Sequence, residues 1–156
     1  MGFFRVAKVF EVEYGHRLAK HPEKCRFPHG HRLRIEVVLR ADRLDRHDMV
    51  CDYKALKLVA LELVERLDHA LAINADDPHR KALEAVSERV LAFEGADPTT
   101  EVLARWLYEG LRQRLEGGGE VCSPGGAVYR IPPGIELERV RVWETSASWA
   151  EYVGVP

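Results

Sequence analysis

Residues 4–16 read FRVAKVFEVEYGH, and residues 29–40 read HGHRLRIEVVLR. Both stretches alternate apolar and polar side chains with a period of two, which is typical of half-buried strands. Lys8 is the one polar residue on the apolar side of the first stretch. The segment between the stretches, residues 17–28, is polar and holds two prolines. The two stretches therefore predict an antiparallel hairpin, the simplest pairing of consecutive strands.

Helical spacing replaces this alternation after the hairpin. Apolar residues recur at i, i+3 and i+4 up to residue 67, which predicts a helix. Asp52 is the candidate N-cap of this helix. A second helix is expected to begin at Asp97-Pro98, with the Asp as its cap, and to stop at the glycines of residues 117–119. Between the helices, residues 74–97 are mixed, with a turn expected at residues 76–78 and a short strand over residues 89–93. Two final strands are expected, over residues 135–144 and 148–153. The order β-β-α-α-β-β indicates an α+β fold.

Composition narrows the function classes. The chain has 156 residues, and we expect residues 1–156 to form a single domain. Lys and Arg number 23 and Asp and Glu number 25, so the net charge of −2 favours neither nucleic acid nor a membrane surface as a partner. The charged start of the chain and the absence of a long apolar run argue against a signal peptide or a membrane span. We therefore expect a cytoplasmic protein.

Three of the seven histidines form a pattern with metal-binding potential. His16, His29 and His31 are spaced as H-x12-H-x-H. The spacing of His29 and His31 puts both side chains on one face of a strand. In a hairpin, the end of the first strand lies beside the start of the second, so all three imidazoles can converge there. A single histidine is more often an ordinary core or rim residue, but three converging histidines predict a catalytic Zn(II) site with an open fourth position.

Cys25 lies in the loop that joins the two halves of this predicted site. It could be a fourth metal ligand, a thiolate whose pKa is lowered by nearby positive charge, or an unreactive loop residue. Cys51 and Cys122 have no evident partners and are expected to be structural. The remaining histidines outside the pattern are expected on the surface, with the exception of His69, discussed below.

Residues 25–31, CRFPHGH, have the pattern C-x3-H-G-H. Further motifs are MVCDY at residues 49–53, LDH at 67–69, PTTE at 98–101 and WET at 143–145. Taken in order, these motifs resemble the 6-pyruvoyltetrahydropterin synthase family. Bacterial members of that family include 6-carboxytetrahydropterin synthase of the queuosine (7-deazaguanine) pathway. The resemblance runs from His16 to Tyr152, nearly the whole chain.

The resemblance implies the T-fold, a four-stranded antiparallel sheet with two helices packed on one face. It also implies Zn(II) bound by His16, His29 and His31, which would polarise the side-chain oxygens of dihydroneopterin triphosphate. The implied product is 6-carboxy-5,6,7,8-tetrahydropterin, formed with loss of triphosphate and acetaldehyde. Family members form trimers that stack into hexamers with active sites at subunit interfaces, so we expect a homo-oligomer whose sites draw on different subunits.

Roles for further residues follow from the same resemblance. Cys25 would be the base that removes a proton from the side-chain carbon next to the pterin, and Asp68 with His69 would relay a proton. The alternative for this pair is a histidine interacting with the dipole at a helix C-terminus. The short spacing from Cys25 to His29 looks more like the carboxy branch than the animal pyruvoyl branch.

Glu144 continues the parity of the apolar residues Val140 and Val142, so it should face inward. A buried carboxylate is costly unless paired. The family uses this Glu to accept two hydrogen bonds from the pterin ring, and the alternative is an ion pair with Arg139 or Arg141. The residues Thr99, Thr100 and Glu101 could contact substrate or only cap a helix.

Other functions remain open at this point. Within the family they are a pyruvoyl-forming synthase or a related cleavage of the dihydroneopterin side chain. From other classes they are a zinc hydrolase, in which Cys25 is incidental, and a non-catalytic pterin-binding T-fold protein.

Overall fold

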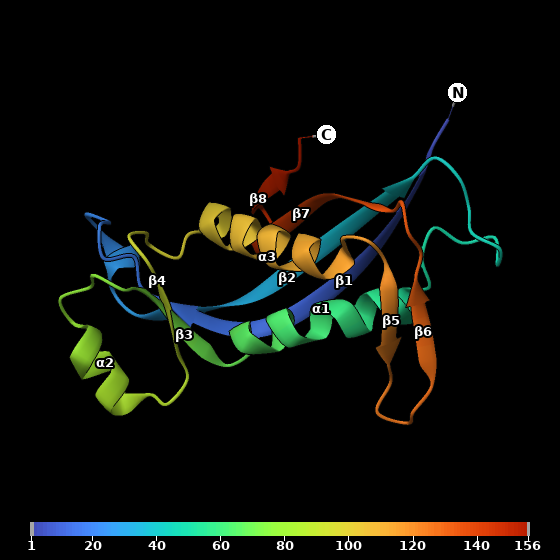
Figure 1. Cartoon of the computed structure of the whole chain (residues 1–156). Helices are drawn as coiled ribbons and strands as arrows, with labels where there is room; N and C mark the ends of the chain where they lie inside the picture. Colours follow the sequence, from blue (N-terminus) through green and yellow to red (C-terminus); the bar gives the residue numbers. More distant parts are fainter. Residues whose placement is uncertain (1, 156) are drawn as a thin grey trace.

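A computed structural model describes residues 2–155, so both end residues of the expected domain, Met1 and Pro156, lie outside the described part. Its main sheet has six strands in the order β4-β3-β1-β2-β7-β8. The strands are β1 (Phe4–His16), β2 (His29–Ala41), β3 (Ala70–Asn74), β4 (Val90–Phe93), β7 (Glu136–Thr145) and β8 (Ser148–Val153). The pairs β1–β2, β2–β7 and β7–β8 are antiparallel, whereas β3 pairs in parallel with β1 and with β4. The sheet is therefore mixed and curled (Figure 1).

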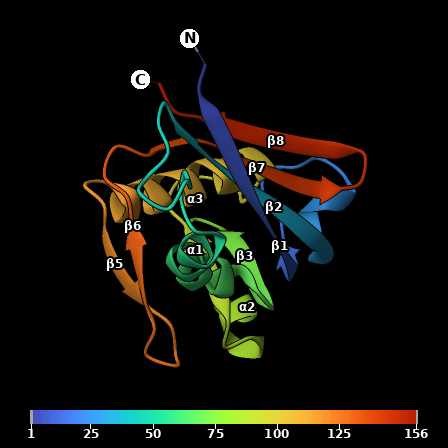
Figure 2. The same ribbon diagram turned by 90° about the vertical axis from the view of Figure 1, so that its right-hand side faces the viewer.

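Two long helices cover one face of this sheet (Figure 2). They are α1 (Tyr53–Leu67), which the side chain of Asp52 caps by accepting a hydrogen bond from the Lys54 N–H, and α3 (Thr100–Leu115). Shorter elements are the 3₁₀ turn η1 (Lys24–Arg26), α2 (Arg80–Val86) and the separate hairpin of β5 (Gly119–Cys122) and β6 (Val128–Ile131). Within residues 2–155, none of the helices is long and apolar enough to cross a membrane.

The core lies between the sheet and these two helices. Inward residues of β2, such as Leu33, Ile35 and Val37, are fully buried, as are Leu103 and Leu107 on α3. This confirms the alternation expected for residues 29–40 and the apolar stripe expected on the second helix. It also leaves the opposite, outer face of the sheet to charged side chains, several of which form ion pairs between strands.

The predicted hairpin is confirmed, and its register sets the position of the histidines. His16 lies directly opposite His29, and Tyr14 lies opposite His31. All four side chains share the face that carries the core, at the end of the sheet nearest the start of α3. The hairpin therefore brings the three histidines together without help from any other element.

The expected four-stranded antiparallel sheet with two helices is wrong in its details, although the α+β class is confirmed. The short strand expected over residues 89–93 is confirmed as β4, which joins the main sheet through the unexpected strand β3, and α2 is a third α-helix. Residues 70–74, ALAIN, are a short apolar run without alternation, so they carry no period that separates strand from helix. No residue of α2 is buried, so that helix adds no side chain to the core.

The start of the last helix also differs from the expectation. Thr99 is the N-cap of α3, and its hydroxyl accepts a hydrogen bond from the Val102 N–H. Asp97, the expected cap, is buried two residues earlier. The carboxylate of Asp97 accepts hydrogen bonds from other segments of the chain. Both residue types are good caps, so the pattern did not distinguish them.

Candidate metal centre

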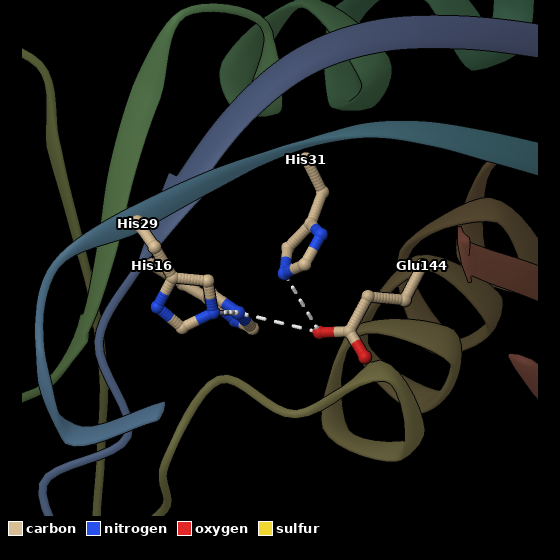
Figure 3. Close-up of side chains that lie close together, drawn as sticks. All are labelled: His16, His29, His31 and Glu144. Carbon is tan, nitrogen blue, oxygen red and sulfur yellow. Dashed lines mark hydrogen bonds and ion pairs between the residues drawn. The ribbon is translucent and has the colours of Figure 1, made fainter. Parts of the chain in front are cut away.

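Three histidines and one glutamate converge at the end of the sheet, on the face turned toward the helices (Figure 3). His16 comes from the end of β1, His29 and His31 from the start of β2, and Glu144 from the far end of β7. One side-chain atom from each of the four residues lies within 4.8 Å of the others. His16 is the most enclosed of them, with 1% of its surface exposed. The structure therefore brings the three predicted metal ligands together.

Backbone carbonyls orient two of the imidazoles. The Nδ1–H of His16 donates to the carbonyl of Pro98 at 2.9 Å, and the Nδ1–H of His29 donates to the carbonyl of Phe27 at 2.7 Å. Since a neutral imidazole carries one N–H, these bonds leave the Nε2 lone pairs free. Such a bond at the far nitrogen is the usual support of a metal-binding histidine.

The free nitrogens face one another at close range. The Nε2 atoms of His16 and His29 are 2.9 Å apart, which brings two lone pairs together. The Nε2 atom of His31 is buried and makes no hydrogen bond with any residue in the range 2–155. A cation between these nitrogens would turn their repulsion into coordination, so the donor set fits a metal ion.

Glu144 completes the geometry of the group. Its Oε1 atom lies 3.3 Å from Nε2 of His16 and 3.2 Å from Nε2 of His31. In a tetrahedral zinc site with bonds of about 2.0–2.1 Å, ligand atoms are about 3.3–3.4 Å apart. The carboxylate oxygen of Glu144 is therefore close enough to border a metal ion held by the three imidazoles. The alternative of an ion pair with Arg139 or Arg141 is wrong, because both of these arginines pair with Glu151 on the outer face.

Burial shifts the pKa values of two of these histidines. The pKa of His16 is lowered, chiefly because burial penalises the charged imidazolium, and the pKa of His31 is lowered for the same main reason. Neutral imidazole is the form that binds a metal. The site therefore favours the binding-competent form of both residues.

Cys25 lies in η1, on the loop that leads from His16 to His29. The side chain is half-buried, and the thiol is free. The Leu18 N–H donates to the carbonyl of Cys25 at 2.9 Å, and the guanidinium of Arg17 donates to the carbonyl of Arg26. These bonds hold the loop against the end of β1. Cys25 is not part of the converging donor group, which argues against its role as a fourth ligand.

Asp68 and His69 lie outside this converging donor group. Asp68 follows α1 directly, and its carboxylate lies 3.1 Å from Nδ1 of His69. His69 is largely exposed, at 71% of its side chain, and lines a shallow hollow together with the outward-facing Glu13 and Arg32. His29 and His31 border the same hollow, but their imidazole nitrogens converge on the face of the sheet that carries the core, whereas His69 is exposed beside outward-facing residues. The His69 interaction is the main cause of the lowered pKa of Asp68.

The segment of residues 98–101 borders the site in a way that the sequence did not indicate. Thr99 has a confirmed capping role, and the hydroxyl of Thr100 contacts the carboxylate of Glu101 at 3.3 Å. The group that reaches the site is the carbonyl of Pro98, which accepts from His16 and also from the Tyr14 hydroxyl at 3.2 Å. A backbone carbonyl is present in every residue, so no residue type could have signalled this contact.

Comparison with known proteins assigns the chain to a family. The family model described as 6-pyruvoyl tetrahydropterin synthase matches residues 5–155. The chain belongs to this family. A similar protein of Aquifex aeolicus, named 6-carboxy-5,6,7,8-tetrahydropterin synthase, is 30% identical over 96% of this chain and 97% of its own length. A protein of the same name from Rickettsia felis is 30% identical over 82% of this chain and 94% of its own length.

Solved structures share the fold of this chain. An uncharacterized protein from Wolinella succinogenes superimposes with a TM-score of 0.78 at 23% identity, covering 99% of this chain and 100% of the other. The 6-pyruvoyl tetrahydropterin synthase of Caenorhabditis elegans gives a TM-score of 0.64 at 22% identity, covering 99% and 98% of the two chains. The overall fold of this chain, including β3, β4 and α2, is therefore shared with these structures.

Replacing any one of His16, His29 and His31 by Ala should weaken Zn(II) binding by more than about 100-fold. Each would supply a direct bond to the ion, and losing a residue that only supports a ligand already costs about 10–100-fold. Competition with a chromogenic chelator measures this affinity. His47→Ala is the matched control, since His47 is 61% exposed and lies outside the donor group. Equal affinities for His47→Ala and the three ligand variants would contradict the assignment.

Proposed function

We propose that this protein is a zinc-dependent 6-carboxy-5,6,7,8-tetrahydropterin synthase. The observation that carries the proposal is the convergence of three imidazole nitrogens and a carboxylate at one end of the sheet, in a chain of this family. The names of the similar proteins support the carboxy branch. The reaction would convert 7,8-dihydroneopterin triphosphate and one water to the carboxylated tetrahydropterin, triphosphate and acetaldehyde, within queuosine biosynthesis in the cytoplasm.

His16, His29 and His31 would hold the zinc ion, each through Nε2. When bound, Zn(II) supplies Lewis acidity that makes the carbon next to the pterin ring more acidic by polarising side-chain oxygens. The protein's own part is to hold these imidazoles neutral and fixed. The carbonyls of Pro98 and Phe27 do so for two of them.

Glu144 would bind the pterin ring. A carboxylate can accept hydrogen bonds from the adjacent ring N–H and amino groups of a pterin at once, and charge-assisted pairs of this kind are strong and directional. Because Oε1 of Glu144 lies within 3.3 Å of two ligand nitrogens, a ring held by this residue would have its side chain beside the metal. Thr100 and Glu101, next to the same carbonyl of Pro98, would contribute further polar contacts to the substrate.

Cys25 would remove the proton from the side-chain carbon, and Asp68 with His69 would donate or relay a proton. The latter pair is on the opposite side of the sheet in one chain and is open to its surroundings. We therefore propose a homo-oligomer, a trimer or hexamer, in which the Asp-His pair of one subunit completes the zinc site of another.

The proposed reaction is tested by incubating the zinc-loaded protein with 7,8-dihydroneopterin triphosphate and identifying the products by mass spectrometry. We expect 6-carboxytetrahydropterin and acetaldehyde in equal amounts. A pyruvoyl product that keeps all side-chain carbons would instead assign the protein to the pyruvoyl-forming branch. Substrate binding without any product would favour the non-catalytic alternative.

Cys25→Ala should lower the turnover rate by at least about 100-fold, the usual contribution of a general base, while Zn(II) affinity stays unchanged because the thiol is outside the donor group. Steady-state kinetics and chelator competition measure the two effects. Cys122→Ala, at an exposed position of β5, is the control and should keep full activity. Retention of activity in Cys25→Ala would favour a zinc hydrolase, in which the thiol is incidental.

Mixing two inactive variants should restore activity if the site is shared between subunits. Co-assembled Cys25→Ala and His69→Ala chains would place intact Cys25 and intact His69 together in about a quarter of the sites, since subunits combine at random in a symmetric oligomer. The control replaces the second chain by a Cys25→Ala/His69→Ala double variant and should stay inactive. No recovery in the first mixture, or a monomer in sedimentation, would contradict the shared site.

A further inference from the structure

A buried polar pair lies behind the metal centre, away from the converging donor atoms. Asn74 is 3% exposed and Asp97 is 8% exposed. The Oδ1 atom of Asp97 accepts a hydrogen bond from the Asn74 side-chain amide at 3.0 Å, and its Oδ2 atom accepts one from the Lys20 backbone N–H at 2.8 Å. A buried carboxylate is costly unless its oxygens are satisfied, and here both are.

The carboxylate of Asp97 does not cap α3, the helix that follows. Thr99 caps α3, so Asp97 is free of that role. Its two donors instead come from the end of β3 and from the loop that follows β1. That loop continues to Cys25. The side chain of Asp97 therefore ties three segments together at one buried point.

The next residue in the chain carries the connection to the metal centre. Asp97 precedes Pro98, whose carbonyl accepts the Nδ1–H of His16 at 2.9 Å. The proline ring fixes its own φ angle, and the Thr99 N–H donates to the Asp97 carbonyl at 2.8 Å, so little freedom remains between the Asp97 side chain and the Pro98 carbonyl. A displacement of Asp97 would move this carbonyl and with it the imidazole of His16.

We propose that the Asn74–Asp97 pair is a positioning element of the metal centre, which holds the Pro98 carbonyl where it fixes the tautomer and the orientation of His16. Neither side chain of the pair belongs to the converging donor group, so the pair acts through Pro98. The proposal rests on the proposed zinc site. It assigns to Asp97 a part in metal affinity that its place before a helix does not suggest.

The hydrogen-bond polarity of the pair provides the test. In Asp97→Asn, the new amide group must point at either the Lys20 N–H or the Asn74 amide, and both are donors. We expect this variant to bind Zn(II) about 10- to 100-fold more weakly, the usual effect of losing support for a ligand. Asn74→Ala removes only one donor and should shift the affinity in the same direction by a smaller factor.

Exchanging the two residues should restore the affinity. In the double variant Asn74→Asp/Asp97→Asn, the amide at position 97 donates to the carboxylate at position 74 and still accepts from Lys20. The carboxylate at position 74 also keeps its hydrogen bond from the Asp76 N–H, which measures 2.9 Å. We expect Zn(II) affinity within about threefold of the wild type, as measured by chelator competition on folded protein.

A loss of stability alone must be separated from a loss of positioning. Leu111→Ala, a buried position farther along α3, should lower the melting temperature by at least as much as Asp97→Asn but leave Zn(II) affinity unchanged. Wild-type Zn(II) affinity in both Asp97→Asn and Asn74→Ala would overturn this inference but not the proposed function. Equal weakening in Leu111→Ala, or a failure of the exchanged pair to recover, would overturn it as well. A wild-type chain that binds no Zn(II) would overturn the proposed function and this inference together.

Discussion

The antiparallel register between β1 and β2 is the constraint on which the rest of the molecule depends. It pairs His16 with His29 and Tyr14 with His31 across thirteen residues of each strand. Because side chains alternate with a period of two, a slip of one residue would turn one strand's histidines and its core residues to the opposite face. The same ladder thus sets the core and the candidate metal centre. Burial of Leu33 and Ile35 fixes the register that the histidines need.

Neutral groups of the backbone hold two of the histidines in place. The carbonyls of Pro98 and Phe27 accept the Nδ1 protons of two histidines, and the Tyr14 hydroxyl donates to the same carbonyl of Pro98. Burial raises the pKa of Tyr14 and lowers that of His16, so both are held in their neutral forms. A site of neutral donors beside one carboxylate suits a divalent cation, because charged imidazolium groups would repel the cation.

The two faces of the sheet divide the chemistry. The inner face carries the histidines and Glu144, whereas the outer face carries arginine–glutamate ladders and, at its margin, the exposed Asp68–His69 pair. The Asp68–His69 pair of one chain has no route to the inner site of that chain through a close-packed sheet. Cooperation between these groups would therefore need a second subunit, which the proposed homo-oligomer supplies.

The sequence by itself determined the hairpin, the two long helices and the final strands, because period-two and helical patterns report burial directly. The resemblance of its ordered motifs indicated the family. It also placed His16, His29 and His31 on one face by parity alone. Only the tertiary structure decided that Glu144 lies beside two of these histidines, that β3 and β4 extend the sheet in parallel, and that Thr99 rather than Asp97 caps α3. The physical reason is the sequence separation of the interacting residues. Strand parity and helix capping depend on neighbouring residues, whereas the partner of a buried carboxylate or of a short apolar strand is set by segments far away in the chain.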